Sequence, residues 1–162
     1  NAALAPADIT KLNTTPVQWL GGQSTGATIS VNVLTPIDTW RQTQFGTTDS
    51  TGIHADTFDK DGDGLANLLE YATATNPNTN SLTPHSAVRN GANLEYTYTT
   101  NKAATDVSCT VEWSDDFTAW STGGISAPTI VSDDGTSQQI KVTVPAGSGV
   151  TKRFVHLKVT RP

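Results

Sequence analysis

The segment 93-NLEYTYTT-100 places Leu94, Tyr96 and Tyr98 at every second position, with polar residues between them. This alternation predicts a β-strand with one buried face, because successive side chains of a strand point to opposite sides of a sheet. The same pattern recurs in three later segments, 106-DVSCTVEW-113, 138-QQIKVTVP-145 and 153-RFVHLKVT-160. The second half of the chain is therefore predicted to be β-structure.

Turn-forming sequences separate these strands. Examples are Asn90-Gly91, Gly123-Gly124 and 133-DDG-135. Short strands at near-regular spacing, divided by such turns, are typical of an antiparallel sandwich. We predict a mainly β fold, with an antiparallel β-sandwich over residues 81–162.

The first residues of the chain are predicted to be an arm followed by one strand, over residues 1–34. Ile29, Val31 and Val33 alternate there with polar residues, which again is the period of a half-buried strand. Whether this segment belongs to the same domain as the sandwich stays open at the level of sequence.

Residues 35–80 are predicted to form a helix, an acidic loop and a second helix. Thr35 is a suitable N-cap, Pro36 fits the first helical position and Gly46 is a stop signal. Leucines and Ala72 then recur at helical spacing from about 65 to 73, which predicts the second helix. The fold prediction is thus a small helix–loop–helix segment inserted between a leading strand and the sandwich.

The loop itself, 59-DKDGDGLANLLE-70, matches the twelve-residue template of an EF-hand calcium loop. Calcium takes six to eight oxygen ligands, and alternate side chains of a tight loop converge on one point. Gly64 stands at the sixth position, where the chain turns sharply with a positive φ that glycine tolerates. The predicted ligands are Asp59, Asp61, Asp63, the backbone carbonyl of Leu65, Asn67 and Glu70.

Three interpretations of this loop are open: a hydrated acidic turn, a calcium sensor, and a calcium ion that stabilises the fold. Seven matched positions favour a metal site over a turn, and Mg²⁺ is the poorer candidate because it demands small octahedral geometry. A sensor needs an incoming helix and a second hand. Gly52 makes that helix doubtful, and 132-SDDGTS-137 lacks the spacing of a second loop. The structural role is favoured.

Composition restricts the partners. The chain has 162 residues, of which 35% are hydrophobic, and a net charge of −5; this charge argues against nucleic acid and anionic membranes, which need a basic face. Cys109 is the only cysteine, so an intrachain disulfide is impossible, and its alternation with valines favours a buried thiol. No apolar run approaches 18 residues. The polar, turn-rich composition is typical of extracellular modules, and the first residue, Asn1, favours a piece of a longer protein.

The stretch 39-TWRQTQFGTTDSTGIHADTFDKDGDGLANLLEYATATNP-77 resembles a segment near the C-termini of large secreted bacterial proteins, and its loop resembles those of dockerins and thrombospondin type 3 repeats. In those proteins a β-rich tail follows, similar to 111-VEWSDDFTAW-120 and 153-RFVHLKVT-160 here. The resemblance implies a non-catalytic, calcium-dependent C-terminal module. A glycine usual after the second helix is replaced by Thr73 or Ala74. A second loop is missing, so dockerin-type partner binding is not implied.

No catalytic constellation is recognisable. The three histidines, His54, His85 and His156, lie in unrelated segments, and no nucleophile elbow, phosphate loop or zinc spacing occurs. The chain is therefore predicted to be non-enzymatic.

Four aromatic residues suggest a carbohydrate-binding platform, in competition with a core role. Tyr96, Tyr98 and Trp113 share faces with aliphatic residues, which favours the core, whereas Trp120 follows a turn and is the best exposed candidate. Trp120, Tyr96 and Tyr98 are kept as candidate ligand-binding residues.

The function expected from sequence is a calcium-stabilised extracellular module of a larger secreted protein. Its candidate partners are a polysaccharide or a neighbouring domain of the same protein. The alternative is a structural or surface-attachment subunit that self-assembles by adding a strand to an exposed sheet edge.

Overall fold

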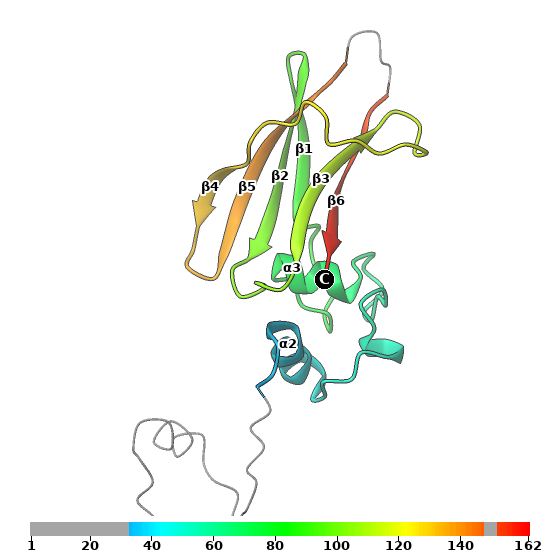
Figure 1. The fold of residues 1–162 in the computed structure, drawn as a ribbon, viewed down its shortest axis with the longest axis vertical. Helices are drawn as coiled ribbons and strands as arrows, with labels where there is room; N and C mark the ends of the chain where they lie inside the picture. Colours follow the sequence, from blue (N-terminus) through cyan, green and yellow to red (C-terminus); the bar gives the residue numbers. More distant parts are fainter. Residues whose placement is uncertain (1–32, 148–151) are drawn as a thin grey trace, which may run out of the picture. The chain divides into compact units, whose positions relative to one another are not determined.

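A computed structural model describes residues 33–147 and 152–162, which belong to one unit, Val33–Pro162 (Figure 1). The expected leading strand lies outside the described residues, except for Val33 and Leu34, which are in neither helix nor strand. Within the described ranges, no helix is long and apolar enough to span a bilayer.

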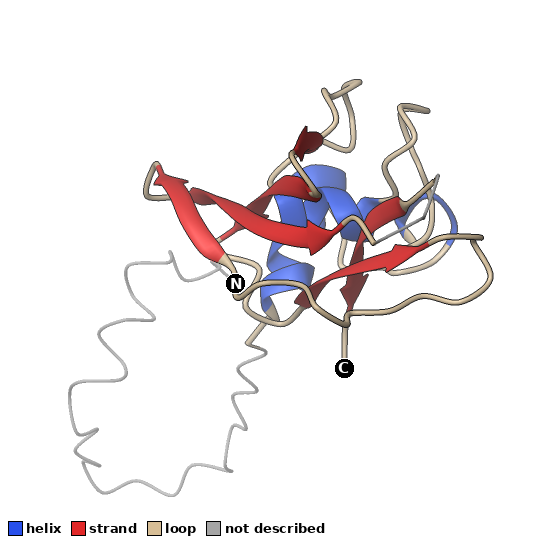
Figure 2. Cartoon of the chain, turned by 90° about the horizontal axis from the view of Figure 1, so that it is seen from above, coloured by secondary structure: helices blue, strands red, loops and turns tan. Residues whose placement is uncertain are grey.

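The fold is mainly β, with strands in two antiparallel sheets (Figure 2). One sheet has four strands in the order β1-β2-β5-β4, and the other pairs β3 with β6. The strands are β1 (His85–Asn90), β2 (Asn93–Asn101), β3 (Ser108–Ser114), β4 (Thr129–Asp133), β5 (Ser137–Pro145) and β6 (Phe154–Thr160). The prediction of antiparallel β-structure over the second half of the chain is confirmed.

Apolar side chains from both sheets meet in one core. Tyr96 and Val142 are cross-strand partners on β2 and β5, and Val111 and Leu157 are partners on β3 and β6. These side chains belong to the same hydrophobic cluster, together with Val144. The arrangement is that of a β-sandwich, and the strand faces predicted from the period of two are those that form its core.

Two strands, β1 and β4, were not predicted. Their residues are exposed almost throughout, so neither sequence alternates between apolar and polar. Both are edge strands: β1 pairs with β2 and β4 pairs with β5, and this pairing holds them in the extended conformation. The β4–β5 pairing also contains a register shift between Ile130 and Ser132, a bulge of the kind that discourages further pairing at an edge.

The first predicted helix is confirmed as α2 (Pro36–Phe45). The Asp38 amide donates to the Thr35 hydroxyl at 3.2 Å, which caps the N-terminus. Gly46, with φ of 73°, ends the helix in the left-handed conformation. A short 3₁₀ helix, η1 (Gly52–His54), then leads toward the acidic loop.

The second helix, α3 (Asn67–Thr73), begins two residues later than predicted. Leu65 is apolar and fits the helical period, but it belongs to the acidic loop, where its amide donates to Asp63 at 2.8 Å. The end at Thr73 agrees with the prediction, and Ala74 takes the left-handed conformation there, with φ of 59°. That is the backbone geometry in which glycine is the usual residue.

Both helices pack at one end of the sandwich (Figure 1). Ile37 of α2 and Tyr71 of α3 form an apolar cluster with Ala104, which lies between β2 and β3. Asp106 joins the same elements, because its carboxylate accepts from the Ile37 amide at 3.1 Å and from the Tyr71 hydroxyl. The acidic loop is therefore attached to a helical segment with its own anchorage on the β-structure.

Candidate metal centre

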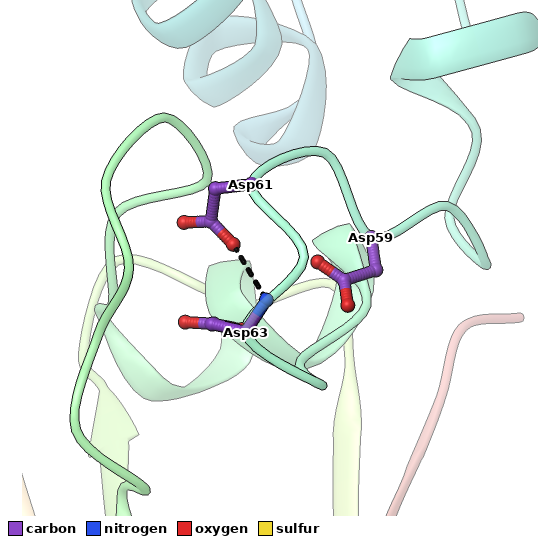
Figure 3. Close-up of side chains that lie close together, drawn as sticks. All are labelled: Asp59, Asp61 and Asp63. Carbon is purple, nitrogen blue, oxygen red and sulfur yellow. Dashed lines mark hydrogen bonds between the residues drawn. The ribbon is translucent and has the colours of Figure 1, made fainter.

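Three aspartates of the acidic loop point to one place. Asp59, Asp61 and Asp63 each offer a carboxylate oxygen, and these oxygens lie within 4.8 Å of one another (Figure 3). Within the described residues this is the one group of three or more acidic, histidine or cysteine side chains with such spacing. The alternation of aspartates in the sequence thus becomes a cluster that could hold a metal ion.

Backbone geometry explains why these side chains converge. Gly62 and Gly64 have φ values of 77° and 93°, which bend the chain around Asp59. The Gly62 and Gly64 amides both donate to the Asp59 carboxylate at 2.8 Å. Asp63 in turn accepts from the Leu65 amide and, across the chain, from the Ser81 amide, each at 2.8 Å. The loop is held in a ligand-gathering shape by its own amides.

Glu70, the twelfth residue of the template, is buried beneath this loop on α3. Its exposed fraction is 0%, and neither carboxylate oxygen has a hydrogen-bond partner within the described residues. Nearly all buried carboxylates have partners, since an unpaired one loses its hydration without compensation. Two unpartnered oxygens on a buried acid therefore indicate a position for a cation or a proton.

Asn67 and Asp61 show the same feature. The Oδ1 atom of Asn67 and the Oδ2 atom of Asp61 are buried without a partner in the described part of the chain. The Asn67 amide nitrogen donates to the carbonyls of Ile53 and Ala55 at 3.0 and 2.8 Å. These two bonds identify the nitrogen of the side chain, so the unpartnered atom is the oxygen, which is the atom a cation would bind.

The electrostatics of Glu70 agree with this geometry. Burial raises its pKa to about 7, and repulsion from Asp61, Asp63 and Asp59 contributes in the same direction. The charged form of Glu70 is thus unfavourable next to three other carboxylates unless a cation is present. A divalent ion would reverse this situation, because it attracts all four groups.

Of the six predicted ligands, the structure brings the three aspartates together. Glu70 is close enough for them to raise its pKa, and Asn67 has a free, buried oxygen. The side chain of Leu65 is buried in the protein, and the role of its backbone carbonyl stays a prediction. The sequence analysis missed the anchoring carbonyls of Ile53 and Ala55, because no motif marks them.

An ion-pair network ties the loop to more distant segments. Arg41 of α2 is buried and pairs with Asp38 at 3.2 Å and with Asp56. Asp56 also pairs with Arg161 near the C-terminus at 3.1 Å, and its carbonyl accepts from the Leu68 amide at 3.0 Å. Asp56 therefore links α2, α3 and the last residues of the chain at the entrance to the acidic loop.

The candidate sugar platform is corrected in two of its three residues. Tyr96 and Tyr98 are 1% and 7% exposed and lie in the sandwich core, so they are not available to a ligand at the surface. The reason is their shared face with Leu94, which packs against the opposite sheet. Trp120 is half-buried and lies on the ring of His156, outside the core.

Trp113 is also occupied within the protein. The Arg153 guanidinium lies 3.7 Å from the centre of its ring, and its indole nitrogen donates to the Gly123 carbonyl at 2.9 Å. Cys109, the lone cysteine, packs against the core, and burial raises the pKa of its thiol. The expectation of a structural thiol fits these surroundings.

Comparisons with family models, with curated proteins and with solved structures find no match to this chain.

Proposed function

We propose that the acidic loop binds one Ca²⁺ ion, which stabilises the helical segment against the β-sandwich. The observation that carries this proposal is the set of buried, unpartnered oxygens on Glu70, Asn67 and Asp61 beside an aspartate cluster. These oxygens are hard ligands in the number and arrangement of the calcium-loop template. In this site the ion is held by the side chains of Asp59, Asp61, Asp63, Asn67 and Glu70 and by the backbone carbonyl of Leu65.

Calcium suits the site better than magnesium does. The donor set contains four carboxylates and one amide within twelve residues, and calcium accepts six to eight such oxygens in flexible geometry. Magnesium is smaller and retains several of its water molecules.

A stabilising role is supported by the elements around the loop. The chain enters through the three-residue η1 and an irregular segment, whereas a sensor hand requires a long incoming helix that can reorient. α3 leaves the loop and is bound to the sandwich, since Asn101 of β2 donates to the Tyr71 carbonyl at 2.9 Å. An ion that fixes the start of α3 therefore also fixes the contact between α3 and the sheet.

The wider role that we propose is that of a non-catalytic extracellular module in a larger secreted protein. The acidic, turn-rich composition supports it. The lack of a nucleophile elbow, a phosphate loop or zinc-ligand spacing in the sequence supports a non-catalytic role.

Calcium titration tests the proposal. Isothermal calorimetry of the chelator-treated protein is expected to give one site per chain, with Mg²⁺ binding much more weakly. At a free calcium concentration of about 100 times Kd, binding adds roughly 2.7 kcal/mol to the free energy of unfolding, which corresponds to an increase in Tm of about 10 °C. A melting curve that is the same in calcium and in chelator would refute the stabilising role.

A further inference from the structure

The outer face of the β3–β6 sheet carries aromatic rings that the metal centre does not use. Phe154 and His156 are two residues apart on β6, so both point away from the core, toward which Val155 and Leu157 point. Phe154 and His156 are each covered by a ring from the segment that follows β3. Phe117 lies over Phe154 with ring centres 3.7 Å apart, and Trp120 is stacked on His156 at 3.8 Å and 9°.

The Phe117 ring is displayed to solvent by a rigid loop. Its exposed fraction is 61%, and its backbone is in the left-handed conformation, with φ of 65°, which a bulky residue rarely adopts. The Phe117 amide donates to the buried Ser114 hydroxyl at 3.0 Å, and Asp116 accepts from the Thr118 amide at 2.8 Å. The loop thus holds an apolar ring in water against the local backbone preference.

Trp120 is held just as firmly. The next residue, Ser121, exchanges two backbone hydrogen bonds of 2.9 Å with Trp113 on β3. Trp120 is therefore fixed at both its ring, by His156, and its backbone. A ligand that contacts these rings finds them already in place, so that binding requires little loss of side-chain freedom.

Polar groups lie next to His156, the residue on which Trp120 is stacked. On the same outer face, Glu112 lies 3.2 Å from the His156 ring nitrogen and accepts from the Lys158 ammonium at 3.1 Å. The Lys158 side chain is about half exposed, so its remaining donors reach solvent. The exposed Phe117 ring, the partly exposed Trp120 ring and the hydrogen-bonding groups beside His156 complement a sugar, which has apolar C–H faces and a rim of hydroxyls.

We propose that the outer face of the β3–β6 sheet binds a saccharide. The binding surface, called here the outer aromatic surface, consists of Phe117, Trp120, His156, Glu112 and Lys158. The two loop rings would stack on sugar faces, and the Glu112–Lys158 pair would bind hydroxyls. This proposal goes beyond the calcium role and rests on different residues. The aspartates of the metal loop take no part in it.

The angle between the rings restricts the ligand. Phe117 and Trp120 have ring centres 6.1 Å apart and planes inclined by 68°. Two rings so inclined cannot both lie on one flat crystalline face, whereas a single chain can present successive units at different angles by rotating about its glycosidic bonds. The expected ligand is therefore a single, soluble saccharide chain and not the surface of an insoluble fibre.

The test is binding of the intact chain, in saturating calcium, to an array of soluble polysaccharides. Calorimetry follows with hexasaccharides of β-1,4-linked glucose, mannose, xylose and N-acetylglucosamine, and with the polysaccharide that binds best. Phe117→Ala is expected to weaken the affinity about tenfold without lowering Tm, because the ring is mainly exposed. Trp120→Leu, which keeps an apolar side chain but loses the aromatic plane, is expected to weaken it as well.

Val88→Ala is the matched control. Val88 is 60% exposed, nearly as much as Phe117, and lies on β1 of the other sheet, so this variant truncates an exposed apolar side chain away from the proposed surface and is expected to bind like the unaltered protein. Absence of binding to every saccharide on the array would overturn the proposal. So would equal affinity of Phe117→Ala, or self-association that Phe117→Ala abolishes in the absence of saccharide binding, since the surface would then be a protein interface.

Discussion

Two loops of this chain contain adjacent or alternating aspartates and a glycine, 59–70 and 132–137, and the surroundings of their carboxylates are opposite. In the second loop, Asp134 accepts from the Thr136 and Ser137 amides and from the Ser137 hydroxyl. Asp133 accepts from the Gly135 amide and the Lys102 ammonium. Every carboxylate oxygen of this turn therefore has a partner supplied by the protein.

The consequences for the pKa values are opposite as well. Hydrogen bonds from Gln138, Lys102 and Gly135 lower the pKa of Asp133 to about 2, whereas burial and neighbouring carboxylates raise that of Glu70 to about 7. Every carboxylate oxygen of the 132–137 turn has a donor from the protein, whereas in the 59–70 loop Asp59 and Asp63 accept from amides but both oxygens of Glu70 and one of Asp61 have no donor among the described residues. A cation site is thus recognised by the acids that a protein leaves unsatisfied, and counting acidic residues is not sufficient.

The largest expected effect comes from Glu70→Gln in calcium. Removal of the two-oxygen ligand should abolish the calcium-dependent part of the stability, about 2.7 kcal/mol at 100 times Kd, and with it the roughly 10 °C rise in Tm. Without metal and above pH 7, where Glu70 is charged, the same variant should be more stable than the unaltered protein, because it removes an unfavourable buried charge. Differential scanning calorimetry with and without chelator measures the change in Tm caused by the substitution in each condition. A change of the same sign in calcium and in chelator would contradict the proposed difference between the two loops.

The second effect is a pH dependence of the metal-free protein. Because the pKa of Glu70 is raised on folding, its contribution to stability is complete below about 4.5 and is lost as the pH rises through about 7. Tm without metal should therefore increase as the pH falls within this window. In calcium the trend should reverse, because protons compete with the ion.

The stability contribution of His85 changes with pH in the direction opposite to that of Glu70, and in the same pH range. Burial lowers the pKa of His85 below 6.5, so its contribution is present above 6.5 and is lost as the pH falls. The Glu70 contribution is isolated by subtracting the profile of Glu70→Gln, measured in chelator, from that of the unaltered protein. A difference that stays flat between pH 4.5 and 7 would show that Glu70 is not in this environment.

A smaller change in Tm is expected from a substitution in the 132–137 turn, whose carboxylates already have hydrogen-bond donors. Asp134→Ala removes four acceptor contacts at the surface and should lower Tm by only a few degrees. The decrease should be the same in calcium and in chelator, since no ion is involved. If the decrease in Tm caused by Asp134→Ala differed between calcium and chelator in the same melting experiment, the 132–137 turn would also respond to calcium, and the two loops would not differ as proposed.

The smallest effects come from a matched pair of glycines. Gly64 and Gly135 have φ values of 93° and 94°, and a methyl group added at either α-carbon would meet no atom within 4 Å. Alanine at either position should cost about 1 kcal/mol through backbone strain alone. Only Gly64→Ala should also weaken calcium affinity, because it distorts the turn that gathers the ligands. Calorimetric titration of both variants distinguishes the two, and unchanged affinity in Gly64→Ala would show that the turn is not part of the site.

Features specified by neighbouring residues could be predicted from sequence. The cap at Thr35 and the stop at Gly46 are local interactions that bound α2. The period of two in β2, β3, β5 and β6 identified the core faces for the same reason. The start of α3 was misplaced because Leu65 satisfies a helical period while its amide is engaged by Asp63, and periodicity does not record that bond.

The edge strands and the exposed aromatic ring could not be predicted from the sequence, because they depend on contacts between distant segments. β1 and β4 exist through pairing with β2 and β5, and β2 and β5 pair with each other although they lie far apart along the chain. The exposed ring of Phe117 was not singled out from sequence, although Trp120 three residues later was. Its display depends on Ser114 and on Phe154, which belong to different strands.

The core strands, the first helix and the convergence of three aspartates could be predicted from the sequence, because each depends on residues only a few positions apart. The burial of Glu70 and Asn67 with unpartnered oxygens, and the placement of the tyrosines inside and of Phe117 outside, became known only from the three-dimensional fold. Burial depends on what packs from elsewhere in the chain. The cost of an unsatisfied charge exists only once that packing has removed the water around it.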